Sequence, residues 1–166
     1  MTTRQTTPAT KLLYTPEQRA RRDGSRWTLV QGVLAPVQFL AFAISLVLVL
    51  RFLATGEGYI AATGSILVKT GLLYLIMVTG AIWEKVVFGQ YLFAPAFFWE
   101  DVFSFAVIAL HTLYLWALWT GALTPTGLML VALAAYATYV INAGQFIWKL
   151  RLARLDMARA DLEAAV

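Results

Sequence analysis

The side chains best suited to chemistry in this sequence are ionisable groups set within otherwise apolar stretches. They are Lys69, Glu84, Lys85, Glu100, Asp101 and His111. A charged group inside a membrane-spanning helix is costly, so such groups mark candidate functional sites. Glu84 and Lys85 precede a short connection, and Glu100 and Asp101 follow it, which predicts an acid cluster around that connection. The alternative is a set of solvated or salt-bridged helix ends, with Asp101 or Glu100 paired with Lys85.

Polar residues recur at helical spacing and predict one inward polar stripe on each of four helices. The stripes are Gln31, Gln38 and Ser45; Tyr74, Ala81, Glu84 and Phe88; Glu100, Ser104, Val107 and His111; and Thr138, Asn142, Gln145 and Lys149. Such stripes either hydrogen-bond helices to one another or line a cavity. We favour a cavity that opens toward the cytoplasmic leaflet.

Aromatic residues frame the acids. Seven of them fall between residues 83 and 99, namely Trp83, Phe88, Tyr91, Phe93, Phe97, Phe98 and Trp99. Rings of this kind form interfacial belts in membrane proteins, or they line a slot for a flat ligand. His111 is either a neutral, hydrogen-bonded residue or an axial ligand to a metal in a bound macrocycle. We expect Lys69 to be structural and to extend toward the outer surface.

Composition fixes the elements that position these residues. The chain has 166 residues, 60% of them hydrophobic, and a mean hydropathy of +0.71. A spanning helix needs roughly 20 mostly apolar residues. The sequence predicts an all-α membrane protein with four transmembrane helices in an antiparallel bundle. The expected spans are 27–53, 60–88, 96–123 and 125–150, and together they form a transmembrane domain at 27–151.

The two ends of the chain carry most of the Lys and Arg residues. We expect residues 1–13 to form a flexible tail, 14–26 a short basic helix on the membrane surface, and 152–166 a C-terminal cytoplasmic tail. Thr15, Pro16 and Gln18 form the start signal of that short helix. The 88–95 connection lies near Lys85, whereas the other two connections offer only Arg51. The positive-inside bias therefore places both termini in the cytoplasm.

Several classes of function are excluded. Cysteine is absent, which rules out disulfides, thiolate metal sites and cysteine nucleophiles. One histidine leaves no cluster for a zinc or di-iron site, and a bis-histidine haem would need a second chain. The net charge of +4 comes from basic residues at the two ends, so it indicates topology and not nucleic-acid binding.

Three blocks of sequence carry a family resemblance, with a fourth at residues 136–149. The three are residues 14–23 (YTPEQRARRD), 27–39 (WTLVQGVLAPVQF) and 80–104 (GAIWEKVVFGQYLFAPAFFWEDVFS). The chain resembles the 3-vinyl bacteriochlorophyllide hydratases of photosynthetic bacteria, also called 2-vinyl bacteriochlorophyllide hydratases, over most of its length. The resemblance implies hydration of the C3 vinyl group of a chlorophyllide to a 1-hydroxyethyl group, a step of bacteriochlorophyll a biosynthesis. It also implies a bacterial inner or intracytoplasmic membrane.

This chemistry needs a proton donor and a proton acceptor. We expect Glu100 to be the acid and Glu84 or Asp101 the base, with Asn142 or Gln145 positioning the water. The candidate substrate-binding residues are His111, Asn142, Gln145, Gln38, Tyr91 and Trp99. Glu100 and Asp101 are adjacent on a helix, about 100° apart, so they cannot point to the same spot.

No separate cofactor is expected, because the substrate carries its own magnesium. The expected partners are the chlorophyllide-type tetrapyrrole, the lipid bilayer and neighbouring pigment-pathway enzymes. Two other functions remain open: a pigment-binding or assembly protein without chemistry, and a small subunit of a transporter or respiratory complex.

Overall fold

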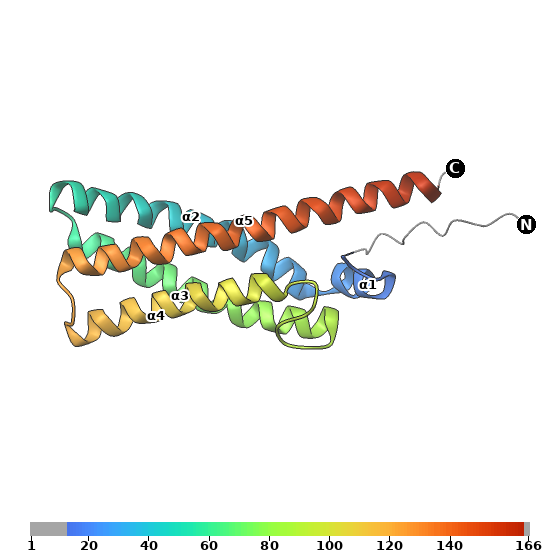
Figure 1. Ribbon diagram of the computed structural model, residues 1–166, viewed down its shortest axis with the longest axis horizontal. Coiled ribbons are helices and arrows are strands. Elements are labelled where there is room, and N and C mark those ends of the chain that lie inside the picture. The colour runs from blue at the N-terminus through green and yellow to red at the C-terminus, as the bar shows by residue number, and fades with distance from the viewer. Residues whose placement is uncertain (1–12, 165–166) are drawn as a thin grey trace, which may run out of the picture.

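Four long helices make up most of the protein. The computed structural model describes residues 13–164, so the expected flexible tail, apart from Leu13, lies outside the described residues. The long helices are α2 (Arg26–Thr55), α3 (Tyr59–Phe88), α4 (Phe98–Thr120) and α5 (Pro125–Ala164). All four are long and apolar enough to cross a membrane, α5 up to Leu155. Figure 1 shows them side by side, with consecutive helices running in opposite directions. The predicted all-α polytopic bundle is confirmed.

The helix bounds differ from the expected spans at two places. The third spanning helix begins at Phe98 and ends at Thr120, inside the expected 96–123. The fourth continues as helix to Ala164, well past the expected end of the span at 150. This extension projects beyond the end of the bundle in Figure 1.

A short fifth helix, α1 (Pro16–Gly24), starts as the sequence predicts. The Thr15 hydroxyl accepts a hydrogen bond from the Gln18 N–H, and the Gln18 side chain accepts one from the Thr15 N–H. This reciprocal pair satisfies two helix-end donors that would otherwise be unpaired. Ser25 then ends α1 and caps α2. The helix packs against α3, which fixes it to one end of the bundle, here called the α1 end.

The loop 89–97 closes the α1 end between α3 and α4. Gly89 ends α3 with a φ of +86°, a left-handed conformation that glycine adopts without steric cost. Its N–H donates to the Lys85 carbonyl, which satisfies one of the last acceptors of the helix. The loop therefore leaves α3 at a sharp angle and returns to α4 at Phe97.

Two apolar clusters hold the bundle together. The larger one lies between the four long helices and includes the buried residues Phe42, Val49, Ile66, Leu73, Val107, Tyr114, Met129 and Tyr136. The smaller one lies at the α1 end and is built on Tyr14, Val87, Phe97 and Ala153. Tyr14 thus anchors the start of α1 to the end of α3 and to the part of α5 around Ala153.

Part of each predicted polar stripe faces inward. Buried members come from all four long helices and include Gln38, Ser45, Glu84, Glu100, Ser104, His111 and Asn142. Part of each stripe joins helices directly: Ser45 contacts the Tyr136 hydroxyl at 2.5 Å, and Gln31 donates to Thr79 at 2.8 Å. Interhelical bonding therefore explains some of the buried polar groups, and the remainder concentrate toward the α1 end.

Candidate active site

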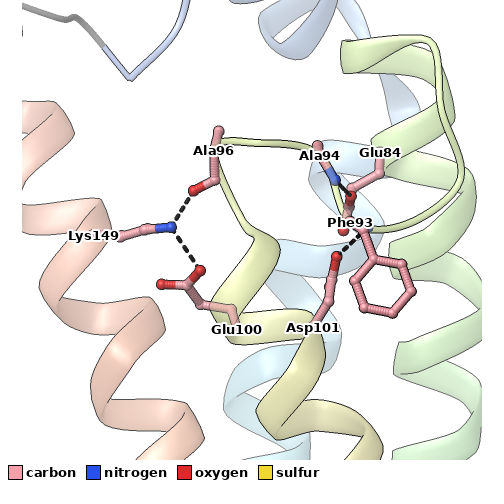
Figure 2. A network of polar contacts seen from close by, with 7 residues as sticks. All are labelled: Glu84, Phe93, Ala94, Ala96, Glu100, Asp101 and Lys149. Atoms are coloured by element: carbon pink, nitrogen blue, oxygen red, sulfur yellow. Dashed lines mark hydrogen bonds and ion pairs between the residues drawn. The ribbon is translucent and has the colours of Figure 1, made fainter.

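The loop 89–97 is held at three points by ionisable side chains, shown in Figure 2. The Phe93 N–H donates to Asp101 Oδ2 at 2.6 Å, and the Ala94 N–H donates to Glu84 Oε2 at 3.3 Å. Lys149 donates to the Ala96 carbonyl from the opposite side. Glu84, Asp101 and Lys149 come from the end of α3, the start of α4 and the middle of α5. The loop and the candidate acids therefore form one structure.

Phe93 has a backbone conformation that its side chain disfavours. Its φ is +59°, in the left-handed region, and it is the one non-glycine residue with positive φ among the described residues. A bulky residue in this region is strained unless its surroundings hold it there. The hydrogen bond to Asp101 is the local contact that does so.

Glu84 and Asp101 form a pair of buried carboxyl groups. Both are almost fully buried, and they accept hydrogen bonds from the N–H groups of two consecutive loop residues, Ala94 and Phe93. Two neighbouring carboxylates repel strongly when both are charged, and a single shared proton removes that repulsion. Each carboxyl uses one oxygen for the loop, which leaves its second oxygen for the partner or for a reacting group. The pair can hold one proton donor and one proton acceptor at the same time.

Glu100 lies in a different environment. Its Oε2 is 2.6 Å from Lys149 Nζ, in an ion pair whose lysine side chain is 23% exposed and whose glutamate side chain is 5% exposed. The same ammonium lies 5.0 Å from the centre of the Phe97 ring. Figure 2 shows Glu100 pointing toward α5 and Asp101 toward the loop. The prediction that these two adjacent acids point to different places is confirmed.

Two of the expected explanations for the acids are wrong. The acids are not solvated helix ends, because all three are buried. Lys85 pairs with neither Asp101 nor Glu100, because its ammonium donates to the Gly89 carbonyl at 2.7 Å. The lysine that forms the ion pair is Lys149, which sequence reasoning placed on the α5 stripe but not in the site. Lys149 shares one helical face with Asn142 and Gln145, and this spacing indicates that its side chain lies on the same side of α5 as the site.

Three amide side chains have buried atoms without partners. Asn142 donates to the Ser104 hydroxyl at 2.7 Å, and its Oδ1 has no partner among the side chains and backbone groups that the structure describes. The Gln145 Oε1 is also unpaired there, as are both polar atoms of Gln38, which is only 2% exposed. Ser104 lies one helical turn below Glu100 and Asp101, about 5 Å deeper along α4. Buried amides with free donors and acceptors can orient a water or a polar substrate group.

His111 and Lys69 form a contact deeper in the bundle. The His111 Nδ1 lies 2.8 Å from the Val107 carbonyl, and its Nε2 lies 3.1 Å from Lys69 Nζ. The carbonyl can only accept, so Nδ1 carries the ring proton and Nε2 accepts from Lys69. The expectation that Lys69 extends to the outer surface is wrong: the side chain is fully buried, against the Tyr139 ring at 4.2 Å. Magnesium ligation by His111, one of the two expected roles, would require Lys69 to leave Nε2.

The aromatic residues divide into two sets. Trp83, Phe88 and Phe97 pack against one another and against Tyr14, with ring centroids 5.7 to 6.3 Å apart. Burial raises the pKa of the Tyr14 hydroxyl above its usual value, while Arg22, 4.7 Å from the ring centre, acts in the opposite direction.

The second set faces outward and contains Tyr91, Phe93, Phe98 and Trp99. The expected slot lined by all seven rings is therefore not formed, because the first set fills the interior of the α1 end.

The fold and the site together define a small polytopic membrane protein with buried acid–base groups at one end of its helical bundle. Among the side chains that the structure describes, which end at residue 158 and leave out 156 and 157, no group of three His, Asp or Glu converges as a metal site. The paired carboxyls, the ion-paired glutamate and the unpaired amides are suited to proton transfer involving a water and an apolar ligand.

Comparison with known proteins identifies the family. The profile of the 2-vinyl bacteriochlorophyllide hydratases matches residues 14–152. A 2-vinyl bacteriochlorophyllide hydratase from Cereibacter sphaeroides is 78% identical over 159 residues, 94% of this chain and 98% of that protein. One from Rhodobacter capsulatus is 76% identical over 155 residues, 93% of this chain and 90% of that protein. The chain belongs to the 2-vinyl bacteriochlorophyllide hydratase family. No solved structure matches it.

Proposed function

We propose that the protein adds water across the vinyl group of a bacteriochlorophyllide-type pigment, giving a 1-hydroxyethyl group. Family membership supports the reaction class. The Glu84–Asp101 pair, two buried carboxyls bonded to consecutive loop residues, is the observation that carries the proposal, because hydration of an alkene needs a donor and an acceptor of protons at one place. The pair offers both, in a buried position next to a strained loop.

The reaction begins with transfer of the shared proton to the terminal vinyl carbon. The electron pair of the double bond forms the new C–H bond and leaves a cation on the carbon attached to the ring, where the conjugated macrocycle spreads the charge. The water oxygen then bonds to that carbon and gives up a proton to the carboxylate of the pair. Each cycle ends with one proton on the pair, as it began, and with one water added to the pigment.

In this proposal the expected role of Glu100 changes. The Glu100 carboxyl is engaged in an ion pair 2.6 Å from Lys149, which makes it a poor choice for the acid. The Glu84–Asp101 pair therefore supplies both the acid and the base. Glu100 and Lys149 position the loop through the Ala96 carbonyl. Asn142, Gln145 and Gln38, with their unpaired buried atoms, orient the water or a polar edge of the pigment.

The reaction needs no redox cofactor, because addition of water transfers no electrons to or from an external carrier. Magnesium belongs to the pigment and enters as part of the substrate. We place the α1 end at the cytoplasmic face of a bacterial inner or intracytoplasmic membrane, where basic residues of α1 and α5 surround it. The product would pass there to neighbouring pigment-pathway enzymes.

Turnover tests the proposal directly. The purified protein in detergent is given 3-vinyl chlorophyllide, and the absorbance spectrum and pigment mass are followed. The expected result is a spectral shift with a mass gain of one water. Binding without that gain would make this a pigment-binding protein and would overturn the proposed activity.

Isosteric variants then test the residues. Glu84→Gln and Asp101→Asn each keep an oxygen that can accept the loop N–H, so loop anchoring is retained while the proton site is lost. We expect each to reduce hydration by at least about a hundredfold with binding retained. Glu57→Gln is the matched control, because Glu57 is exposed in the connection between α2 and α3. Near wild-type hydration by both site variants would exclude the pair and leave His111 as the leading candidate.

A further inference from the structure

Three phenylalanine rings form a continuous row on the outer surface of α4 and its preceding loop. Phe98 and Phe105 are seven residues apart on α4 and therefore share one face, about 10 Å apart along the axis. The Phe93 ring lies between them, with centroid distances of 5.7 Å to Phe98 and 5.5 Å to Phe105. The planes of Phe93 and Phe105 are nearly parallel, at 10°. Phe93, Phe98 and Phe105 are here called the ring row.

The ring row is exposed where spanning helices face lipid. Its members are 39%, 44% and 43% exposed, in the order of the sequence. Trp99 packs edge-on against Phe98 and extends the aromatic surface at the α1 end. This surface is separate from the buried cluster around Tyr14, so it is open to a ligand that approaches through the bilayer.

Backbone strain distinguishes the ring row from an ordinary interfacial aromatic belt. A belt requires only that rings meet the lipid headgroups, which any helical residue can do. Phe93 instead stacks on Phe105 from a left-handed backbone conformation, which costs free energy and persists only where it is held. The group that holds it is Asp101, one of the two acids of the pair. The outer rings and the buried acids are thus joined by one hydrogen bond.

We propose that the ring row is the binding surface for the macrocycle of the substrate, which reaches it from the lipid phase. A planar conjugated tetrapyrrole has the flat shape and the width needed to cover the ring row. Its ring system also stacks favourably on aromatic side chains in an offset arrangement. A macrocycle lying across Phe93 has its edge beside the loop that Asp101 and Glu84 hold, so a peripheral vinyl group would lie next to the loop that covers the acid pair. The inference rests on the proposed function for the identity of the ligand.

Substitution of single rings by leucine tests the surface, because leucine keeps it apolar and removes only the aromatic face. Wild type, Phe105→Leu and Phe93→Leu are placed in lipid nanodiscs and titrated with 3-vinyl chlorophyllide, and binding is followed by pigment absorbance. We expect the Kd to rise about three- to tenfold in each, as for loss of one stacking contact. Phe105→Trp should restore binding. Phe39→Leu on α2 is the matched control, since Phe39 is also exposed.

Photo-crosslinking supplies a second measurement that does not depend on affinity. A photoreactive benzoyl-phenylalanine at position 105 should attach covalently to bound pigment on illumination, and the same group at position 39 should not. Equal Kd values for Phe105→Leu, Phe93→Leu and Phe39→Leu, or equal crosslinking at both positions, would overturn the inference while hydration by the wild type continued. Binding on the ring row without any hydration would instead remove the proposed function and leave the surface in place.

Discussion

Loss of the Lys149 ammonium is expected to destabilise the α1 end measurably. Lys149→Gln removes the cation that lies 2.6 Å from Glu100 and donates to the Ala96 carbonyl. Removing one partner of a fully buried ion pair costs about 3–5 kcal/mol, whereas an exposed pair contributes about 0–1 kcal/mol. Glu100 is buried but Lys149 is 23% exposed. The loss should therefore lie between these limits, about 2 kcal/mol of unfolding free energy.

A double-mutant cycle separates the ion pair from the other contacts of Lys149. The double variant Glu100→Gln, Lys149→Gln leaves no uncompensated charge, so it should recover most of the loss, with a coupling energy of about 1–2 kcal/mol. Unfolding free energies are measured by titrating the protein in mild micelles with a denaturing detergent. Lys85→Gln is the matched control, because Lys85 is exposed and forms no ion pair in the described structure; its effect should stay within about 0.5 kcal/mol. Additive effects of the two site substitutions would refute the reasoning.

Three further predictions concern other parts of the molecule. His111→Phe should destabilise the protein and leave the spectrum of the bound pigment unchanged, because Lys69 donates to His111 Nε2. An altered spectrum, together with poor binding of metal-free pheophorbide to the wild type, would instead establish magnesium ligation by His111. Burial raises the pKa of the Tyr14 hydroxyl, so the stability that the protonated hydroxyl contributes is present below about pH 10 and is lost as the pH rises further. Over that rise the unfolding free energy of Tyr14→Phe should fall less than that of the wild type. Reporter fusions after Arg151 and within residues 89–95 should report the cytoplasm, and one at residues 56–58 the opposite side; a C-terminus on the far side would contradict the topology.

The sequence was sufficient for those features that depend on local periodicity. Apolar stretches of the right length predicted four spans, and Thr15 with Gln18 predicted the start of α1. The spacing of Gln38, Ser104 and Asn142 predicted that they face inward, because side-chain direction along a helix repeats every 3.6 residues whatever surrounds it. The same geometry predicted that Glu100 and Asp101 point apart.

The tertiary structure alone decided which of these groups meet. Lys149 contacts Glu100 although 49 residues separate them, and Lys69 contacts His111 across 42 residues. Helical periodicity fixes the face that a residue occupies, but the neighbour across the interface depends on how the helices are packed and how far each is shifted along its axis. The sequence therefore predicts Lys85 in place of Lys149 as the partner of the acids, and it predicts Lys69 near the outer surface although this side chain is buried.

Helix packing also decided which aromatic rings are buried and which face outward. Trp83, Phe88, Phe97 and Phe98 look alike in sequence, yet the first three fill the α1 end around Tyr14 and Phe98 faces outward. Within the loop, Phe93 faces outward from a left-handed backbone whose N–H donates to Asp101. Phenylalanine has no local preference for that conformation. Only the buried carboxyl of α4, placed by the packing of the whole bundle, makes it stable.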